Sequence, residues 1–202
     1  MVSADSAPLA GPQAGKDLPA ALRVEEFRAL RATIRERGSL RVIVAVGGLA
    51  AWALLHLAVQ ISIPMPVTSL VPLLVLAGAF EAVFALHVGV ERIGRYLEAA
   101  YEADVPADPM GPQWEHAAHA FGRSLTDAAG RLDPLFAALF VFASILNLVP
   151  VLLETWTPPY VELGVYGAVH LVFIVRVDRA RRFARRQRAQ ELVAFARLTK
   201  NI

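Results

Sequence analysis

Residues 67–104, VTSLVPLLVLAGAFEAVFALHVGVERIGRYLEAAYEAD, decide the fold. The stretch opens as an apolar run of membrane length that carries one carboxylate, Glu81, near its centre. It then continues into a charged segment, and no proline separates the two parts. An α-helix needs about 20 apolar residues to cross a bilayer. We therefore predict one long helix that leaves the membrane near Glu91 and continues as a charged helix, with the other segments packed around it.

The composition indicates a membrane protein. The chain has 202 residues, of which 56% are hydrophobic and 19% are charged, whereas soluble domains are about half apolar and about a quarter charged. The apolar residues are concentrated in four blocks. We predict an all-α integral membrane bundle of four transmembrane helices, which cover about 40–63, 68–90, 134–153 and 160–175.

The segments outside these blocks are polar. Residues 1–18 are rich in Ala, Gly, Pro and Ser and are expected to form a disordered tail. Residues 19–38 follow helical spacing and predict a cytoplasmic amphipathic helix, with a bend allowed at Gly38–Ser39. The transmembrane domain, 39–175, includes a cytoplasmic loop, 91–133. Residues 176–202 predict a basic C-terminal helix.

The arginines predict the topology. They flank the start of the first span and the ends of the second and fourth, whereas the connectors after the first and third spans contain no Lys or Arg. Basic residues remain on the cytoplasmic side of a membrane. Both termini are therefore predicted to be cytoplasmic, in a bacterial inner membrane, with two short turns outside.

Polar side chains inside the spans form a candidate intramembrane cluster: Glu81, Ser144, Asn147 and His170. At 1.5 Å per helical residue, Glu81 lies about 15 Å, Ser144 about 14 Å and His170 about 9 Å from the cytoplasmic ends of their spans. A carboxylate in lipid costs about 3 kcal/mol or more, so it should face the bundle and find a partner. We expect a Glu81–His170 pair, which either exchanges a proton or forms a structural hydrogen bond.

A second candidate network lies at the cytoplasmic boundary of the spans. It contains His87, Glu91, Arg95 and Arg176, with a Glu91–Arg176 link that would fix helix register. Other arginines close to the membrane are expected to contact anionic lipid headgroups: Arg31, Arg35, Arg37, Arg179, Arg182 and Arg186.

No catalytic constellation is recognisable, and we expect no enzyme activity. The sequence has no Cys, which excludes disulfides and thiolate ligands. Glu115, His116 and His119 do not match a metal-binding order, so no metal is expected. Haem held by His87 and His170, whose estimated depths differ by about 3–5 Å, is kept as an alternative cofactor. The basic tail directly follows a span, so lipid rather than nucleic acid is its expected partner.

One buried glutamate within four spans resembles the small multidrug-resistance transporters, although their carboxylate lies in the first helix and they lack a long cytoplasmic loop and basic tail. The resemblance implies one alternative function, a small oligomeric proton-coupled transporter or channel that uses Glu81. The leading hypothesis is a non-enzymatic accessory, scaffold or assembly subunit, in a homo-oligomer or a larger membrane complex. A haem-binding electron carrier is a second alternative.

Overall fold

The computed structural model describes residues 20–63, 65–102, 134–153 and 160–200, and long helices dominate these residues. The helices are α1 (Ala20–Ser62), α2 (Leu70–Leu97), α4 (Pro134–Leu153) and α5 (Tyr160–Lys200), with a 3-10 turn, η1 (Pro66–Ser69), before α2 and a π-helical turn, η2 (Glu98–Glu102), after it. The all-α prediction is confirmed. The predicted tail 1–18 and the loop after residue 102 lie outside the described residues.

Three helical stretches are long and apolar enough to cross a membrane: Ala21–Ser62, Pro66–Tyr101 and Pro134–Leu153. The 43 residues of α1 extend for about 64 Å, roughly twice the ~30 Å hydrocarbon thickness of a bilayer. The helix passes through Gly38 and Ser39 without interruption. Helix α5 likewise continues through Arg176, so both helices combine a predicted span with its predicted extension.

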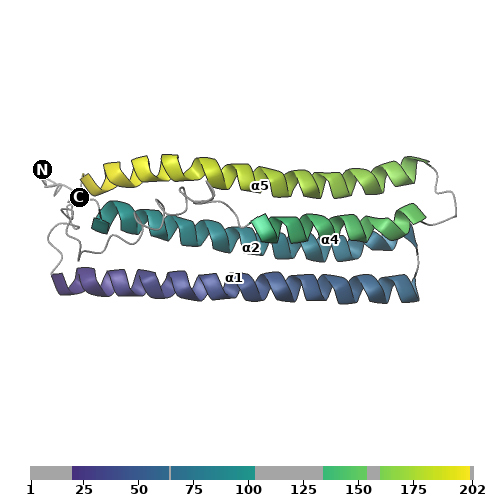
Figure 1. Cartoon of the computed structure of the whole chain (residues 1–202), viewed down its shortest axis with the longest axis horizontal. Coiled ribbons are helices and arrows are strands. Elements are labelled where there is room, and N and C mark those ends of the chain that lie inside the picture. Colours follow the sequence, from purple (N-terminus) through teal and green to yellow (C-terminus); the bar gives the residue numbers. More distant parts are fainter. Residues whose placement is uncertain (1–19, 64, 103–133, 154–159, 201–202) are drawn as a thin grey trace, which may run out of the picture.

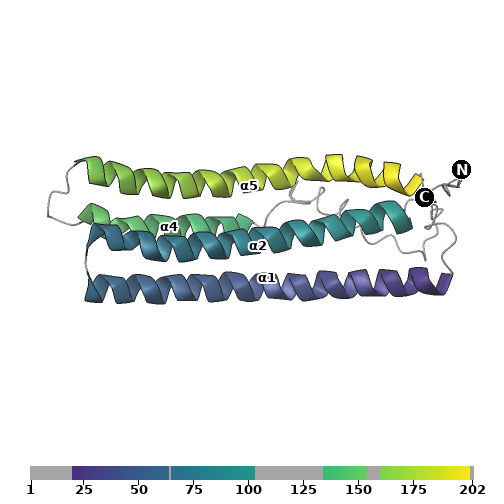
Figure 2. The ribbon, with the colours of Figure 1, turned by 180° about the vertical axis from the view of Figure 1, so that it is seen from behind.

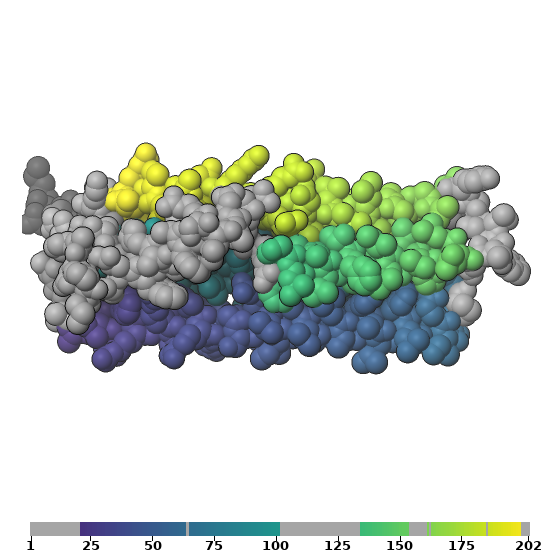
Figure 3. Space-filling model, viewed as in Figure 1, coloured from purple at the N-terminus to yellow at the C-terminus, as the bar shows by residue number. Residues whose placement is uncertain are grey.

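The helices form an elongated bundle (Figures 1 and 2). Its two halves differ in the side chains that they carry. Helix α4 is present in one half alone, where it lies between α1 and α5 on the face shown in Figure 3. We call this the apolar half; the remainder, formed by the first part of α1, the last part of α2 with η2, and the last part of α5, is the charged half. Arg41 marks their boundary, because it bonds His87 and lies 5.6 Å from the ring of Phe136, near the start of α4.

Helix α2 is the central helix, because it packs against α1, α4 and α5. Its buried residues recur three or four positions apart, as in Leu73, Leu76, Phe80, Val83 and His87, which places them on one stripe of the helix. The Phe80 ring has edge contacts with the rings of Phe140, at 5.4 Å, and Phe173, at 5.9 Å. The prediction that the other segments pack around this helix is therefore confirmed.

Helices α1 and α2 approach closely at one pair of small residues. A Cβ atom added to Gly48 would clash with the Cβ of Ala79, so no larger residue fits without a shift. The neighbouring Gly47 has open space, as do Gly164 and Gly167 on α5. The small residues of the first two spans therefore make a close contact at Gly48, whereas the glycines of α5 do not.

Candidate functional site

Four residues in the apolar half form a buried hydrogen-bonded group, which we call the central node: Trp52, Ser69, Asn147 and His170. Trp52 Nε1 donates to Asn147 Oδ1 at 3.2 Å. Asn147 Nδ2 donates to the carbonyl oxygen of Ser69 at 2.8 Å and lies 3.0 Å from His170 Nε2. The node therefore connects α1, η1, α4 and α5 through one amide.

The hydrogen bonds define the protonation state of His170. Its Nδ1 lies 2.8 Å from the carbonyl oxygen of Tyr166, which can only accept, so Nδ1 carries the proton. Its Nε2 faces an amide N–H donor of Asn147 and is therefore the acceptor. His170 is neutral with both ring nitrogens engaged, which suits a structural role.

The predicted intramembrane cluster is only partly formed. Asn147 and His170 meet as expected, but Glu81 does not join them. Ser144 is fully buried on α4, and its Oγ has no hydrogen-bond partner among the described residues. The sequence reasoning also missed Trp52 and the Ser69 carbonyl. The indole N–H was a usable signal, because a buried Trp normally finds an acceptor.

Glu81 pairs with Arg176 rather than with His170, so that predicted pair is wrong. Arg176 Nη2 donates to Glu81 Oε2 at 2.7 Å, and the two side chains are 39% and 49% exposed. Phe80 occupies the buried stripe of α2, and the next residue of a helix points about 100° away from it. Glu81 therefore faces outward, beside α5, where a guanidinium compensates its charge.

Glu81 lies near the Arg41–His87 boundary between the two halves. It is six residues from His87, or about 9 Å along the helix axis. The depth of about 15 Å below the cytoplasmic end of the span stays a prediction. Position near the boundary lowers the cost of an ion pair in lipid.

The Glu81–Arg176 contact also shows that the two candidate haem ligands, His87 and His170, lie at different levels along the bundle. His87 lies six residues from Glu81 toward the charged half, and His170 lies six residues from Arg176 in the opposite direction. Because Glu81 and Arg176 touch, the two histidines are about 18 Å apart along the bundle. Two axial ligands of one haem must instead face each other across the ring.

The structure pairs the residues of the predicted boundary network differently from the prediction. His87 Nδ1 lies 3.1 Å from a guanidinium nitrogen of Arg41, which donates to it. Arg95 contacts Glu91 at 3.4 Å. The predicted Glu91–Arg176 link is wrong, because Arg176 bonds Glu81 about ten residues further into the apolar half.

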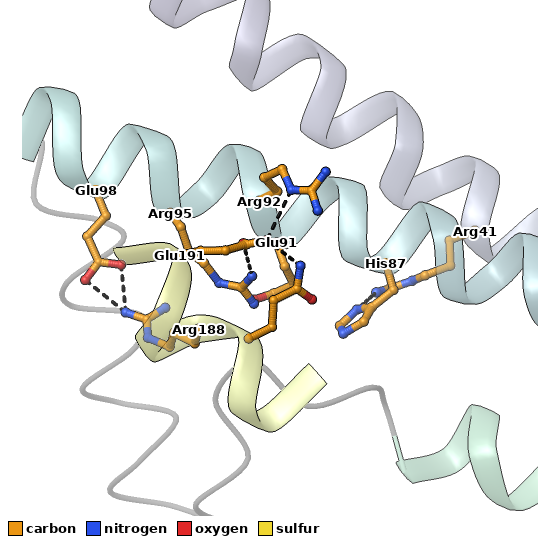
Figure 4. Close-up of polar contacts among 9 residues, drawn as sticks. Arg41, His87, Glu91, Arg92, Arg95, Glu98, Arg188 and Glu191 are labelled. Carbon is orange, nitrogen blue, oxygen red and sulfur yellow. Dashed lines mark hydrogen bonds and ion pairs between the residues drawn. The ribbon is translucent and has the colours of Figure 1, made fainter. Parts of the chain in front are cut away.

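The charged half contains a buried ion network between α2 and α5 (Figure 4). Arg95 is 1% exposed and donates to Glu191, which also accepts from Arg92 at 3.1 Å and from Gln187. Burial raises the pKa of Glu191, but the hydrogen bonds from Arg95, Gln187 and Arg92 outweigh it and lower the pKa below its usual value. The buried guanidinium is thus matched by a carboxylate.

Two further contacts extend this network along the charged half. Arg188 donates to both carboxylate oxygens of Glu98, at 2.9 and 2.7 Å. Tyr96 and Tyr101 donate to the two oxygens of Glu26, at 2.9 and 2.7 Å. Burial, followed by these bonds to a carboxylate, raises the pKa of both phenols. Polar side chains therefore connect α2 to α1 on one side and to α5 on the other.

The arginines predicted to contact headgroups have various partners. Arg31 lies 5.3 Å from the Phe27 ring, Arg182 pairs with Asp178 at 2.6 Å, and a Cβ on Gly89 would lie 2.8 Å from Arg37. The full set remains a prediction for lipid contact: Arg31, Arg35, Arg37, Arg179, Arg182 and Arg186.

The described residues contain no group of three His, Asp or Glu side chains placed to hold a metal ion. Glu115, His116 and His119 lie outside those residues. No protein-family model matches the chain, and neither curated proteins nor solved structures show significant similarity to it.

Proposed function

We propose that the chain is a multi-pass protein of the bacterial inner membrane that acts as a non-enzymatic scaffold or assembly subunit. The apolar half would lie in the bilayer. Its three apolar stretches support membrane insertion. The first part of α5 packs along α4 and α2, so a bilayer that surrounds those helices also surrounds α5 as a fourth crossing.

The charged half is proposed to lie in the cytoplasm. The start of α1 and the end of α5 lie at the same end of the bundle (Figure 1). The arginines of α1, α2 and α5 lie on this side of Arg41 or close to it, whereas the sequence between α1 and η1 and between α4 and α5 contains no Lys or Arg. The positive-inside rule then assigns the charged half to the cytoplasm.

The observation that carries the proposal is the continuity of α1, α2 and α5 from the apolar half into the charged half. From Arg41 to its start, α1 extends for about 32 Å beyond the boundary. Within this stretch, the Arg95–Glu191 contact connects α2 to α5, and the Arg188–Glu98 contact connects η2 to α5. The charged half would therefore form a stalk that holds its surface at a fixed distance from the membrane, as a scaffold requires.

The stalk also presents apolar side chains to water. Leu22 and Val24 on α1, and Val193 and Leu198 on α5, are between 47% and 58% exposed. We propose these side chains as the contact points for a protein partner. Glu81, by contrast, is already compensated by a permanently charged guanidinium, which weakens the case for a proton carrier.

Purification from native membranes in mild detergent tests the proposal. We expect a stoichiometric partner to copurify with the wild-type chain and with Glu81→Gln, but not with a Val193→Glu/Leu198→Glu double variant. Circular dichroism should show that all three chains keep their helices. A partner-free wild-type protein that conducts protons in liposomes, and loses that activity in Glu81→Gln, would instead indicate the transporter.

A further inference from the structure

A groove opens between α2 and α5, on the outside of the bundle. It has a volume of about 470 Å³ and is lined by Phe84, Arg176, Arg179 and Phe183. The two phenylalanine rings meet edge to face at 6.1 Å and form its apolar wall. The Arg176 guanidinium lies 5.1 Å from the Phe84 ring, so cation–π contact holds it at the edge of this wall.

The groove lies where the two halves of the molecule meet. Phe84 is three residues from Glu81 and three from His87, which places it about 5 Å inside the Arg41–His87 boundary. The orientation proposed above puts this level at the inner surface of the bilayer, where headgroups give way to acyl chains. The apolar wall beside guanidinium groups fits a molecule that has both an anionic and an apolar part.

The charges at the groove leave one positive charge without compensation. Glu81 neutralises Arg176, and Asp178 is taken by Arg182, at 2.6 Å. Arg179 is exposed and has no acidic partner among the described residues. A phosphodiester carries one negative charge, and a guanidinium binds phosphate oxygens through two parallel hydrogen bonds.

We propose that this groove binds one anionic phospholipid of the cytoplasmic leaflet. Arg179, with Arg176 beside it, holds the headgroup phosphate, and an acyl chain passes Phe84 into the apolar half. Phe183, four residues closer to the charged half than Arg179, borders the headgroup. The proposal depends on the membrane orientation assigned above but not on the scaffold role, so a chain without any protein partner could still bind the lipid.

Native mass spectrometry of the delipidated full-length chain, titrated with phosphatidylglycerol or phosphatidylethanolamine, tests the site. We expect one phosphatidylglycerol to bind more tightly than the zwitterionic lipid. Arg179→Gln should weaken this binding about fivefold, since one Arg near anionic lipid contributes about 1 kcal/mol. Phe84→Ala should weaken it as well.

Arg181→Gln is the matched control, because it removes the same charge two residues away on α5, about 200° around the helix, without lining the groove. It should change phosphatidylglycerol binding less than twofold. Equal losses in Arg179→Gln and Arg181→Gln would show diffuse attraction and overturn the proposal. Equal binding of both lipids, or displacement of phosphatidylglycerol by millimolar inorganic phosphate, would overturn it too.

Discussion

At the scale of single residues, the structural role of a polar side chain in this protein follows from its hydrogen-bond partners rather than from its position along the span. Asn147 has both amide hydrogens and its oxygen engaged, and it uses them on groups from three other elements. Glu81, which looked like the costly residue in the sequence, is half exposed and paired. The group that holds the apolar half together is therefore a neutral amide, and the carboxylate is peripheral.

Replacing Asn147 tests this role. Asn147→Leu keeps the side-chain size but leaves Trp52, Ser69 and His170 without their shared partner. Interhelical hydrogen bonds in membranes average about 0.6 kcal/mol, so loss of three should cost about 2 kcal/mol. Unfolding in SDS, followed by tryptophan fluorescence, measures the loss. Ser144→Ala, also buried on α4 but without a described bond, should change stability little; an equal cost would contradict the central node.

The lowered pKa of Glu191 predicts acid sensitivity of the charged half. A carboxyl with a lowered folded pKa stabilises above its unfolded pKa, about 4.3, and this contribution is lost as pH falls through the folded pKa. Near pH 7, Glu191→Gln should cost about 2 kcal/mol, because hydrogen bonds to charged groups are lost. Thermal melts in detergent should show this difference shrinking below about pH 4.3.

A surface ion pair provides the control for that experiment. Glu25 pairs with Arg28 while both side chains are mostly exposed, at 66% and 70%. Glu25→Gln should therefore shift stability by no more than about 0.5 kcal/mol at any pH. A Glu191→Gln penalty that stays constant down to pH 3 would mean that Glu191 does not stabilise the fold as an anion.

At the scale of elements, the sequence predicted the helices well and their partners poorly. The α4 bounds and the start of α5 agree with prediction, because apolar runs and proline positions are local signals. The partners of Asn147 lie 95 and 78 residues away in the chain. Their meeting depends on how far each helix is rotated and shifted against its neighbours, which no local pattern specifies. The rotation of α2 about its axis likewise places Phe80 in the core of the bundle and Glu81 on its outer face.

The close approach of α1 to α2 gives a prediction at this scale. Gly48→Ala brings its Cβ against Ala79 and forces the helices apart, at a cost of about 1–3 kcal/mol. Gly47→Ala enters open space and gains helix propensity, so it should be neutral or slightly stabilising. SDS unfolding of both variants compares them directly. Equal stabilities would show that the two helices do not pack through Gly48.

At the scale of the whole molecule, one bundle combines an apolar half that suits lipid with a charged half that suits water. The apolar half buries the central node and turns apolar side chains outward, such as Leu54, Ile61 and Leu74. The Glu81–Arg176 pair lies on its outer face, near the boundary. The charged half buries ion pairs instead, with Arg95 at its centre. The change occurs at the level of Arg41 and His87, where we place the lipid site and the inner surface of the membrane.

Cysteine labelling from each side of the membrane tests this arrangement most directly, because the sequence contains no Cys. Val67→Cys, in η1, and Ala189→Cys, on the charged half of α5, are both exposed positions. A membrane-impermeant maleimide should label Val67→Cys in intact spheroplasts and Ala189→Cys only after lysis. Labelling of Ala189→Cys from outside, or recovery of the chain in the soluble fraction, would contradict the account.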